Sequence, residues 1–216
     1  MYRRLITAAL LSVCLPAIAQ ADPIIPNSSF EAGNTGFTSG YKYNTDLVPE
    51  GNFFIDSGSS AHNSFWTQNV AAHSGSQYMI VNGDPTPGVT VYDAKNIAVL
   101  ANTQYFFSAW VTALSPPSPS ILQFSINGTE VNTPLTITPT VGLWQELFVP
   151  WFSGASTLAE ISLLNENTVM QGNDFGLDDI ALSTTQPVTN VPEPLTLSLF
   201  AAGLAGAAAL RRRKRA

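Results

Sequence analysis

The chain has 216 residues and a formal net charge of −6, and 45% of its residues are hydrophobic. Between residues 22 and 190, however, there are only two basic residues, Lys42 and Lys95, against 14 acidic ones, a formal charge of −12. A surface this acidic argues against nucleic acid as a partner, because binding to phosphate requires Lys and Arg. It favours divalent cations or neutral partners.

Residues 1–21 have the composition of a secretory signal peptide. Arg3 and Arg4 precede an apolar run over residues 5–18, which closes on small residues. Cleavage after Ala19 or after Ala21 fits the small-x-small pattern, and the cut after Ala21 is preferred. The only cysteine lies inside this segment. The mature chain is therefore expected to have no disulfide and to rely on a packed core, or on a metal, for its stability.

Residues 22–185 are predicted to form one all-β domain, large enough to bury a core of its own. Strands are expected at 77–81, 89–92, 105–111, 121–126, 145–151, 158–164 and 175–182. Turns rich in Gly, Pro and Asn separate them, and Asn127-Gly128 predicts a hairpin. Many short strands without a long helical period indicate an antiparallel β-sandwich or jelly roll.

Several motifs in this region resemble carbohydrate-binding modules of the galactose-binding-like jelly-roll fold. They are NSSFE at 27–31, AHSGSQYMIVNG at 72–83, the strand at 105–111 and GNDFGLDDI at 172–180. The resemblance implies a structural Ca²⁺ held by the carboxylates of Glu31 and of Asp178 or Asp179, with backbone carbonyls near Ser29, Ser74 and Ser76. Ca²⁺ takes six to eight oxygen ligands at about 2.3–2.6 Å. The alternative is that these acids are solvated charges at strand ends.

Only one residue of the pair Asp178 and Asp179 is expected to face the ion. Successive residues of a β-strand point to opposite faces of the sheet. Asp178 is the preferred ligand.

Aromatic and amide side chains in the polar loops are the candidates for sugar binding, because sugar sites combine ring platforms with polar side chains that bond the hydroxyls. The candidates are Tyr41, Tyr43, Asn63, Trp66 and Gln68. Trp66 has polar neighbours and is expected to be the most exposed tryptophan, with packing in the core as an equal alternative. The other three, Trp110, Trp144 and Trp151, are expected to pack in the core.

No catalytic motif is present in the sequence. The only histidines are His62 and His73, neither of them in an H-E-x-x-H pattern, and there is no G-x-S-x-G elbow, P-loop or G-x-G-x-x-G fingerprint. His73 belongs to the HSG motif, where a structural role is expected. The sequence therefore predicts a non-enzymatic protein. A glycan-active enzyme, the alternative, would need two carboxylates facing a groove.

The end of the chain has three parts after a linker at 186–190. Val191-Pro192-Glu193-Pro194 is followed by an uncharged apolar segment at 195–210 and a basic cluster at 211–215. As a helix the apolar segment would span about 24 Å, short of the hydrocarbon core of about 30 Å. Basic residues stay on the cytoplasmic side. The segment is therefore either a permanent membrane anchor or a transient stop that is removed.

These three parts resemble the PEP-CTERM sorting signal of Gram-negative bacteria that make exopolysaccharide. The resemblance implies that an exosortase-type membrane protease recognises the tail while residues 195–210 hold the protein transiently in the inner membrane. Processing would release the protein to the cell surface or extracellular matrix. The sequence thus indicates an exported module with a polysaccharide as its candidate ligand and a structural Ca²⁺ as its candidate cofactor. A purely structural matrix or adhesion protein remains an alternative.

Overall fold

The computed structural model describes residue 22 and residues 24–187. The predicted signal peptide, most of the linker and the sorting tail at 191–216 lie outside the described residues. The boundary between the two units of the chain falls between Thr185 and Gln186. Over 24–187 and at residue 22, the structure contains no helix with the length and apolar character needed to cross a membrane.

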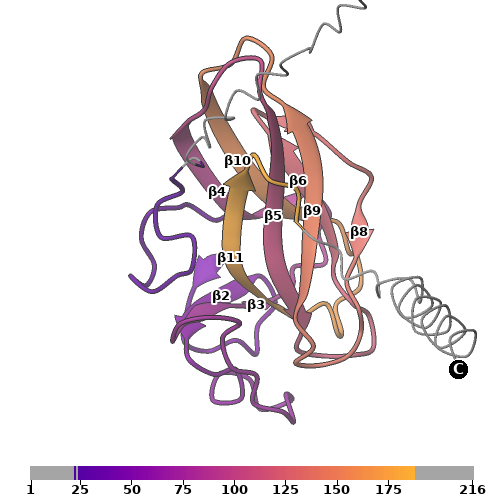
Figure 1. Cartoon of the computed structure of the whole chain (residues 1–216). Coiled ribbons are helices and arrows are strands. Elements are labelled where there is room, and N and C mark those ends of the chain that lie inside the picture. Colours follow the sequence, from indigo (N-terminus) through magenta and orange to yellow (C-terminus); the bar gives the residue numbers. More distant parts are fainter. Residues whose placement is uncertain (1–21, 23, 188–216) are drawn as a thin grey trace, which may run out of the picture. The chain divides into compact units, whose positions relative to one another are not determined.

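The strands of the described chain form two sheets (Figure 1). The first has, in spatial order, β1 (Lys42–Tyr43), β2 (Asn52–Asp56), β3 (Tyr78–Asn82), β11 (Phe175–Ser183), β5 (Gln104–Ala113) and β9 (Gln145–Phe152). The second has β4 (Val89–Ala98), β10 (Leu158–Asn165), β6 (Ile121–Ile126) and β7 (Thr129–Glu130), with β8 (Leu135–Thr136) paired to β6. All paired strands are antiparallel except β1 and β2. The predicted all-β antiparallel fold is confirmed.

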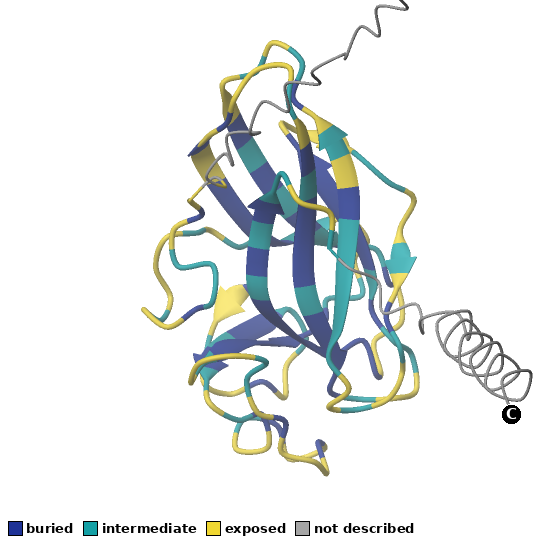
Figure 2. Ribbon diagram, viewed as in Figure 1, coloured by how far each residue is buried: buried dark blue, intermediate teal, exposed yellow. Residues whose placement is uncertain are grey.

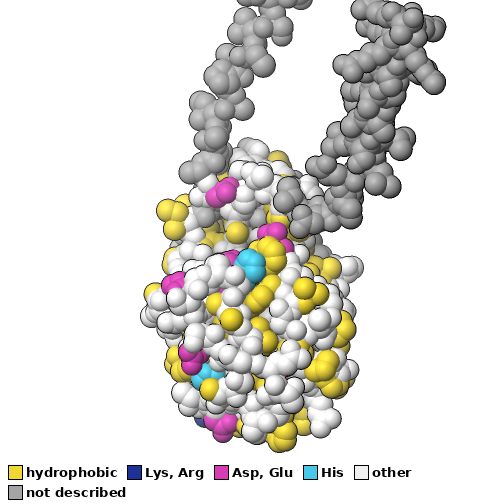
Figure 3. All heavy atoms as spheres, turned by 60° about the horizontal axis from the view of Figure 1, so that its bottom comes forward, with side chains coloured by type: hydrophobic (Ala, Val, Ile, Leu, Met, Phe, Trp, Pro, Cys, Tyr) yellow, Lys and Arg dark blue, Asp and Glu magenta, His cyan; other side chains and the backbone are white. Residues whose placement is uncertain are grey.

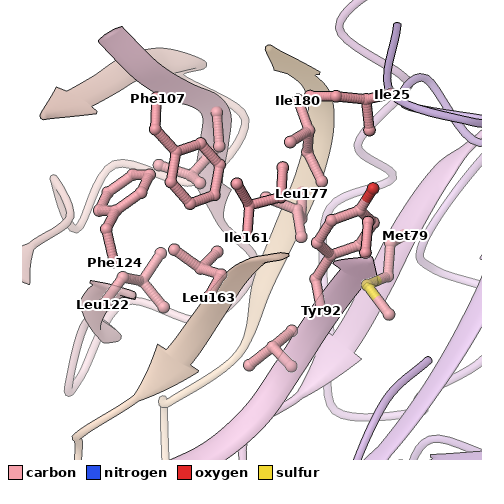
Figure 4. Packing of buried hydrophobic residues seen from close by; sticks show 14 of the residues in the cluster. Ile25, Met79, Tyr92, Phe107, Leu122, Phe124, Ile161, Leu163, Leu177 and Ile180 are labelled. Carbon is pink, nitrogen blue, oxygen red and sulfur yellow. The ribbon is translucent and has the colours of Figure 1, made fainter. Parts of the chain in front are cut away.

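The core lies between the two sheets, and the alternation of residues along β5 shows how it is built. Tyr105 and Phe107 are 1% exposed and face inwards, whereas Phe106 and Trp110 are only half-buried on the outer face. Phe107 meets Phe124 of β6 edge to face, with ring centroids 4.7 Å apart. This contact joins the sheets, as Figure 4 shows. The buried positions of Figure 2 accordingly run along the strands, and most of the exposed positions lie in loops.

The hairpin predicted at Asn127-Gly128 is present. Ile126 of β6 pairs with Thr129 of β7, which leaves a loop of two residues. Both loop residues have positive φ, 52° for Asn127 and 72° for Gly128. A tight hairpin turn of this kind requires that conformation, and Asn and Gly adopt it most readily.

Strand β2 was not predicted from the sequence, because both of its faces are covered. Phe53 packs in the main core, while Phe54, the next residue, packs against a second apolar cluster that contains Trp66 and Tyr78. A strand buried on both sides shows no alternation of apolar and polar residues. Strand β4 continues beyond the predicted 89–92 to Ala98, past a register shift against β10.

Candidate functional site

The loop of the HSG motif is held by two carboxylates, one from near the start of the domain sequence and one from near its end. One oxygen of Glu31 accepts the backbone N–H groups of Ser76, at 2.7 Å, and Gln77, at 2.8 Å. One oxygen of Asp178 accepts those of His73, at 3.0 Å, and Ser74, at 3.2 Å. The structure therefore brings together most of the residues implied for calcium.

The fit of these residues to Ca²⁺ depends on the backbone. Ser29 lies half-buried two residues before Glu31. Within the described residues, no group of three or more His, Cys, Asp or Glu side chains is arranged to hold a metal ion. Glu31 and Asp178 each have lone pairs beyond those used by the N–H groups. An ion here would take its remaining ligands from backbone carbonyls.

The expectation that Asp178 and Asp179 point to opposite faces is wrong. Asp178 accepts backbone N–H groups of the HSG loop, and Asp179 bonds to the same loop through the His73 ring at 2.6 Å and the Ser74 hydroxyl at 2.8 Å. The register of β11 against β5 shifts between Asp178 and Ala181, and Asp179 has a φ of 43°. Such a bulge breaks the alternation of a strand and redirects a side chain.

His73 packs on the outer face of the first sheet. Its ring stacks on Trp110 with centroids 3.8 Å apart and planes 14° apart, and Trp144 meets it edge-on. Together with the bond to Asp179, this stacking fixes the ring in place. Burial raises the pKa of Asp178 beneath the loop to about 6, although three backbone N–H groups act in the opposite direction.

Tyr41, Tyr43 and Gln68, three of the five sugar-binding candidates, do not share a cavity. Tyr41 is 5% exposed, and its hydroxyl accepts bonds from the Asp84 N–H and the Asn165 amide. Tyr43 is 42% exposed and stacks on Phe54, and Gln68 is exposed in a loop. The structure thus leaves only Asn63 and Trp66 of this set side by side.

Trp66 is the most buried of the four tryptophans, so the expectation that it is the most exposed is wrong. It is 6% exposed, and its indole N–H donates to Asp174 at 2.8 Å. The polar residues around it are turn residues that fold over the ring. Asn63, for example, bonds the Leu47 carbonyl and the Phe65 N–H.

A pocket of about 310 Å³ opens beside Trp66, where β3 and β5 end and β11 begins. We call it the loop-end pocket. Its lining includes Glu50, Phe65, Trp66, Asn82, Met170 and Asp174, and also Asn63. These residues come from the loops before β2, between β2 and β3 and before β11, and from the end of β3. Figure 3 looks toward this end of the domain, which shows carboxylates and almost no Lys or Arg.

Three oxygens of the loop-end pocket have no hydrogen-bond partner. Six buried side-chain polar atoms lack one in the described part of the chain, and three of these, Glu50 Oε2, Asn82 Oδ1 and Asp174 Oδ1, belong to residues lining this pocket. Asn82 Oδ1 is an acceptor, because the Asn82 amide N–H groups already bond the carbonyls of Leu47 and Val48. The two carboxylate oxygens are acceptors when their groups are ionised. A buried acceptor without a donor costs about 1–3 kcal/mol. These three oxygens have almost no accessible surface, so a donor group of a ligand would reach them only if the side chains that carry them turned toward the pocket.

The two carboxylates of the pocket are hard to ionise. Burial, and then the charges of Asp174 and Asp84, raise the pKa of Glu50 to about 7. Burial raises the pKa of Asp174 to about 6, against the opposing bonds from Trp66 and the Gly83 N–H. Glu50, Asn82 and Asp174 were not predicted as site residues. Each lies at a turn, and nothing in the sequence shows that the three turns meet.

Comparison with known proteins supports two interpretations of the sequence, the C-terminal sorting signal and the β-sandwich fold. Residues 190–214 match the model of the PEP-CTERM protein-sorting motif. The chain carries this sorting signal. No curated protein sequence matches the chain significantly.

Solved structures similar to this chain include carbohydrate-binding modules. One, TmCBM61 in complex with β-1,4-galactotriose, has a TM-score of 0.51 and 13% identity over 76% of this chain and 99% of that one. An arabinose-bound α-L-arabinofuranosidase gives 0.50 and 10% identity over 74% of this chain and 26% of that one. The xylan-binding CBM22-1 domain of Paenibacillus barcinonensis Xyn10C has a TM-score of 0.49 and 19% identity, over 79% of this chain and 100% of that one. Identities this low show the fold alone, and the predicted β-sandwich fold is confirmed.

The raised pKa of Glu50 predicts that stability falls as pH rises. Between its ordinary value of 4.5 and about 7, Glu50 is ionised in the unfolded chain but largely protonated in the folded one, so stability is lost across this window. We expect the melting temperature to be higher at pH 5 than at pH 8. Glu50→Gln should raise it at pH 8 by about 2–4 °C, the shift for about 1 kcal/mol after solvent screening.

Thermal unfolding followed by circular dichroism at the two pH values measures this effect. Glu130→Gln is the control, because Glu130 is exposed on β7. Equal melting temperatures of wild type and Glu50→Gln at pH 8 would contradict the electrostatic account.

Proposed function

We propose that this chain is an exported, non-enzymatic protein of the cell surface or extracellular matrix that binds a polysaccharide in the loop-end pocket. The observation that carries the proposal is the set of three unpartnered oxygens beside Phe65 and Trp66. Sugar hydroxyls are the donors that such oxygens lack. The carbohydrate-binding-module fold and the PEP-CTERM motif support the proposal.

The apolar lining of the pocket suits the face of a sugar ring. Phe65 is 77% exposed and Met170 is 58% exposed, although both line the pocket. Exposed apolar side chains at the rim of a polar cavity are typical of ligand sites.

Phe65→Ala should therefore weaken polysaccharide binding without unfolding the protein. We expect the binding free energy to fall by about 1.5 kcal/mol, the lower end of the range for burying a Phe side chain, which corresponds to about a tenfold rise in Kd. Isothermal titration of the purified full chain with matrix oligosaccharides measures it. Phe152→Ala is the matched control, since Phe152 is 58% exposed and pairs with Gln104 at the far end of β5.

The two variants also test the rival class of a purely structural matrix or adhesion protein. That class predicts no saturable binding by wild type. If Phe65→Ala and Phe152→Ala weaken binding equally, the ligand does not occupy the loop-end pocket.

A glycan-active enzyme is the second candidate, because Glu50 and Asp174 line one pocket with pKa values raised to about 7 and about 6. Glycosidases use two carboxylates in different protonation states. Binding is favoured because one oxygen of Asp174 is already committed to the Trp66 indole. If wild type releases reducing ends from a polysaccharide and Glu50→Gln does not, the enzyme is favoured.

We also propose that an exosortase-type protease processes the tail at the Val191-Pro192-Glu193-Pro194 motif and that the apolar segment at 195–210 is a transient membrane stop. In an exopolysaccharide-producing host, wild type should lose the residues after about Pro192 and leave the membrane. Glu193→Ala should keep its full mass and stay in the inner membrane. Intact mass and cell fractionation measure both. If both forms keep the tail, the segment is a permanent anchor.

A structural Ca²⁺ near Glu31 and Asp178 is the third part of the proposal. An ion present at about 100 times its Kd stabilises a fold by about 2.7 kcal/mol, which is about 5–10 °C for a domain of this size. EDTA should therefore lower the melting temperature of the full chain, and calcium should restore it. Glu31→Gln should abolish the difference. An unchanged melting temperature in EDTA would remove calcium from the account.

A further inference from the structure

The loop-end pocket combines negative charge with a shortage of donors. Its unpartnered oxygens include one from each of two carboxylates, Glu50 and Asp174, and the carboxylate of Asp84 adds its charge to that of Glu50. In residues 22 and 24–187 the only Lys or Arg side chains are Lys42 and Lys95, and neither lines the pocket. Within the described part of the chain, therefore, no Lys or Arg side chain neutralises this site.

This arrangement discriminates between classes of sugar. A uronate, sulfated or phosphorylated residue would bring a second negative charge to the carboxylates and is disfavoured. A neutral residue can donate hydroxyl groups but leaves the charge uncompensated. An ammonium group supplies three donors and a positive charge, and its bonds to carboxylates are the stronger, charge-assisted kind.

The size and lining of the pocket argue against a bare metal ion as the main occupant. Its volume is about 310 Å³, and Phe65, Trp66 and Met170 contribute apolar surface to it. A cation surrounded by oxygens uses neither the space nor the apolar wall. A ring with one apolar face and polar substituents uses both.

We propose that the loop-end pocket binds an amino-sugar residue of a polysaccharide, with its ammonium group between the carboxylates of Glu50 and Asp174 and its ring against Phe65. The inference rests on the proposed polysaccharide binding and names the class of sugar. In this arrangement Asn82 Oδ1 accepts a hydrogen bond from a ring hydroxyl. The Asn82 residue is 3% exposed, and its amide nitrogen is held by two hydrogen bonds, to the carbonyls of Leu47 and Val48.

Binding of an ammonium group at this site depends on pH in a defined direction. The carboxylates of Asp174 and Asp84 and the Tyr41 hydroxyl are the titratable groups that act on or near Glu50. The raised pKa values mean that at pH 5 the two pocket carboxyls are largely neutral. Affinity for an amine should rise from pH 5 to pH 7, while affinity for a neutral sugar should change little.

The test is isothermal titration of the purified full chain with four probes, at pH 5 and pH 7. The probes are a β-1,4-linked glucosamine trimer, its fully N-acetylated counterpart, trilysine and calcium chloride. We expect the glucosamine trimer to bind at least tenfold more tightly than the acetylated trimer at pH 7, with this preference lost at pH 5. Glu50→Gln should remove the preference at pH 7, and Glu130→Gln should keep it.

The possible results separate this inference from the proposed function. Equal binding of both trimers at pH 7 overturns the amino-sugar assignment but leaves polysaccharide binding in place. Trilysine binding as tightly as the glucosamine trimer also overturns it, because the pocket would then recognise ammonium groups without the sugar. Calcium that binds wild type but not Glu50→Gln, without any amine preference, replaces the sugar by a metal. If neither trimer binds, the amino-sugar assignment fails; if the matrix oligosaccharides do not bind either, the proposed polysaccharide binding fails as well. The pH comparison uses wild type alone and does not depend on the folding of a variant.

Discussion

Asp178 is completely buried, and its carboxylate accepts backbone N–H groups from His73, Ser74 and Asp179. Asp22, Glu31, Asp46, Asp56 and Asp84 also accept backbone N–H groups, and only Lys42 and Lys95 are available as cations in the described chain. Among these residues only Lys95 pairs with acids, Asp93 and Glu160, beyond the two His–Asp contacts. Buried anions that lack cations must be solvated by N–H and O–H groups of the protein. The loops fold around carboxylates for this reason.

The two ends of β3 differ in how far this solvation is completed. At the HSG loop, Glu31 and Asp178 each accept at least two N–H groups, and the His73 ring is locked by stacking and by Asp179. At the loop-end pocket, one oxygen of Asp174 is satisfied by Trp66 and the other is not. The first arrangement is that of a structural site. The second has unfilled capacity, which is what a ligand site requires.

The sequence predicts those features that depend on local patterning. Strand β5 alternates along its length, and Asn127-Gly128 specifies a hairpin, so both could be predicted. The three-part tail is readable because its parts are contiguous. The bulge at Asp179 could not be predicted, since a positive φ at Asp leaves no compositional signal and the alternation rule assigns the side chain to the wrong face.

The loop-end pocket could not be predicted from the sequence for a different reason. Glu50 precedes β2, Asn82 ends β3 and Asp174 precedes β11, so the site exists only once three loops distant in the chain converge. Trp66 illustrates the same limit. Its polar neighbours in the sequence suggest exposure, but in the structure it is buried and donates a hydrogen bond to Asp174, which lies 108 residues later in the chain. Long-range contacts of this kind carry no local pattern from which to predict them.

Strand β11 separates the pocket from the two ends of the described chain. Asp174 immediately precedes this strand of nine residues, which at about 3.3 Å per residue is about 30 Å long. At its other end, the Asp22 carboxylate accepts bonds from Ser183 and Thr184. The first described residue and the exit toward the tail therefore lie together, at the end of β11 away from the pocket. None of the residues that line the pocket lies next to Asp22 or Thr184 in the chain.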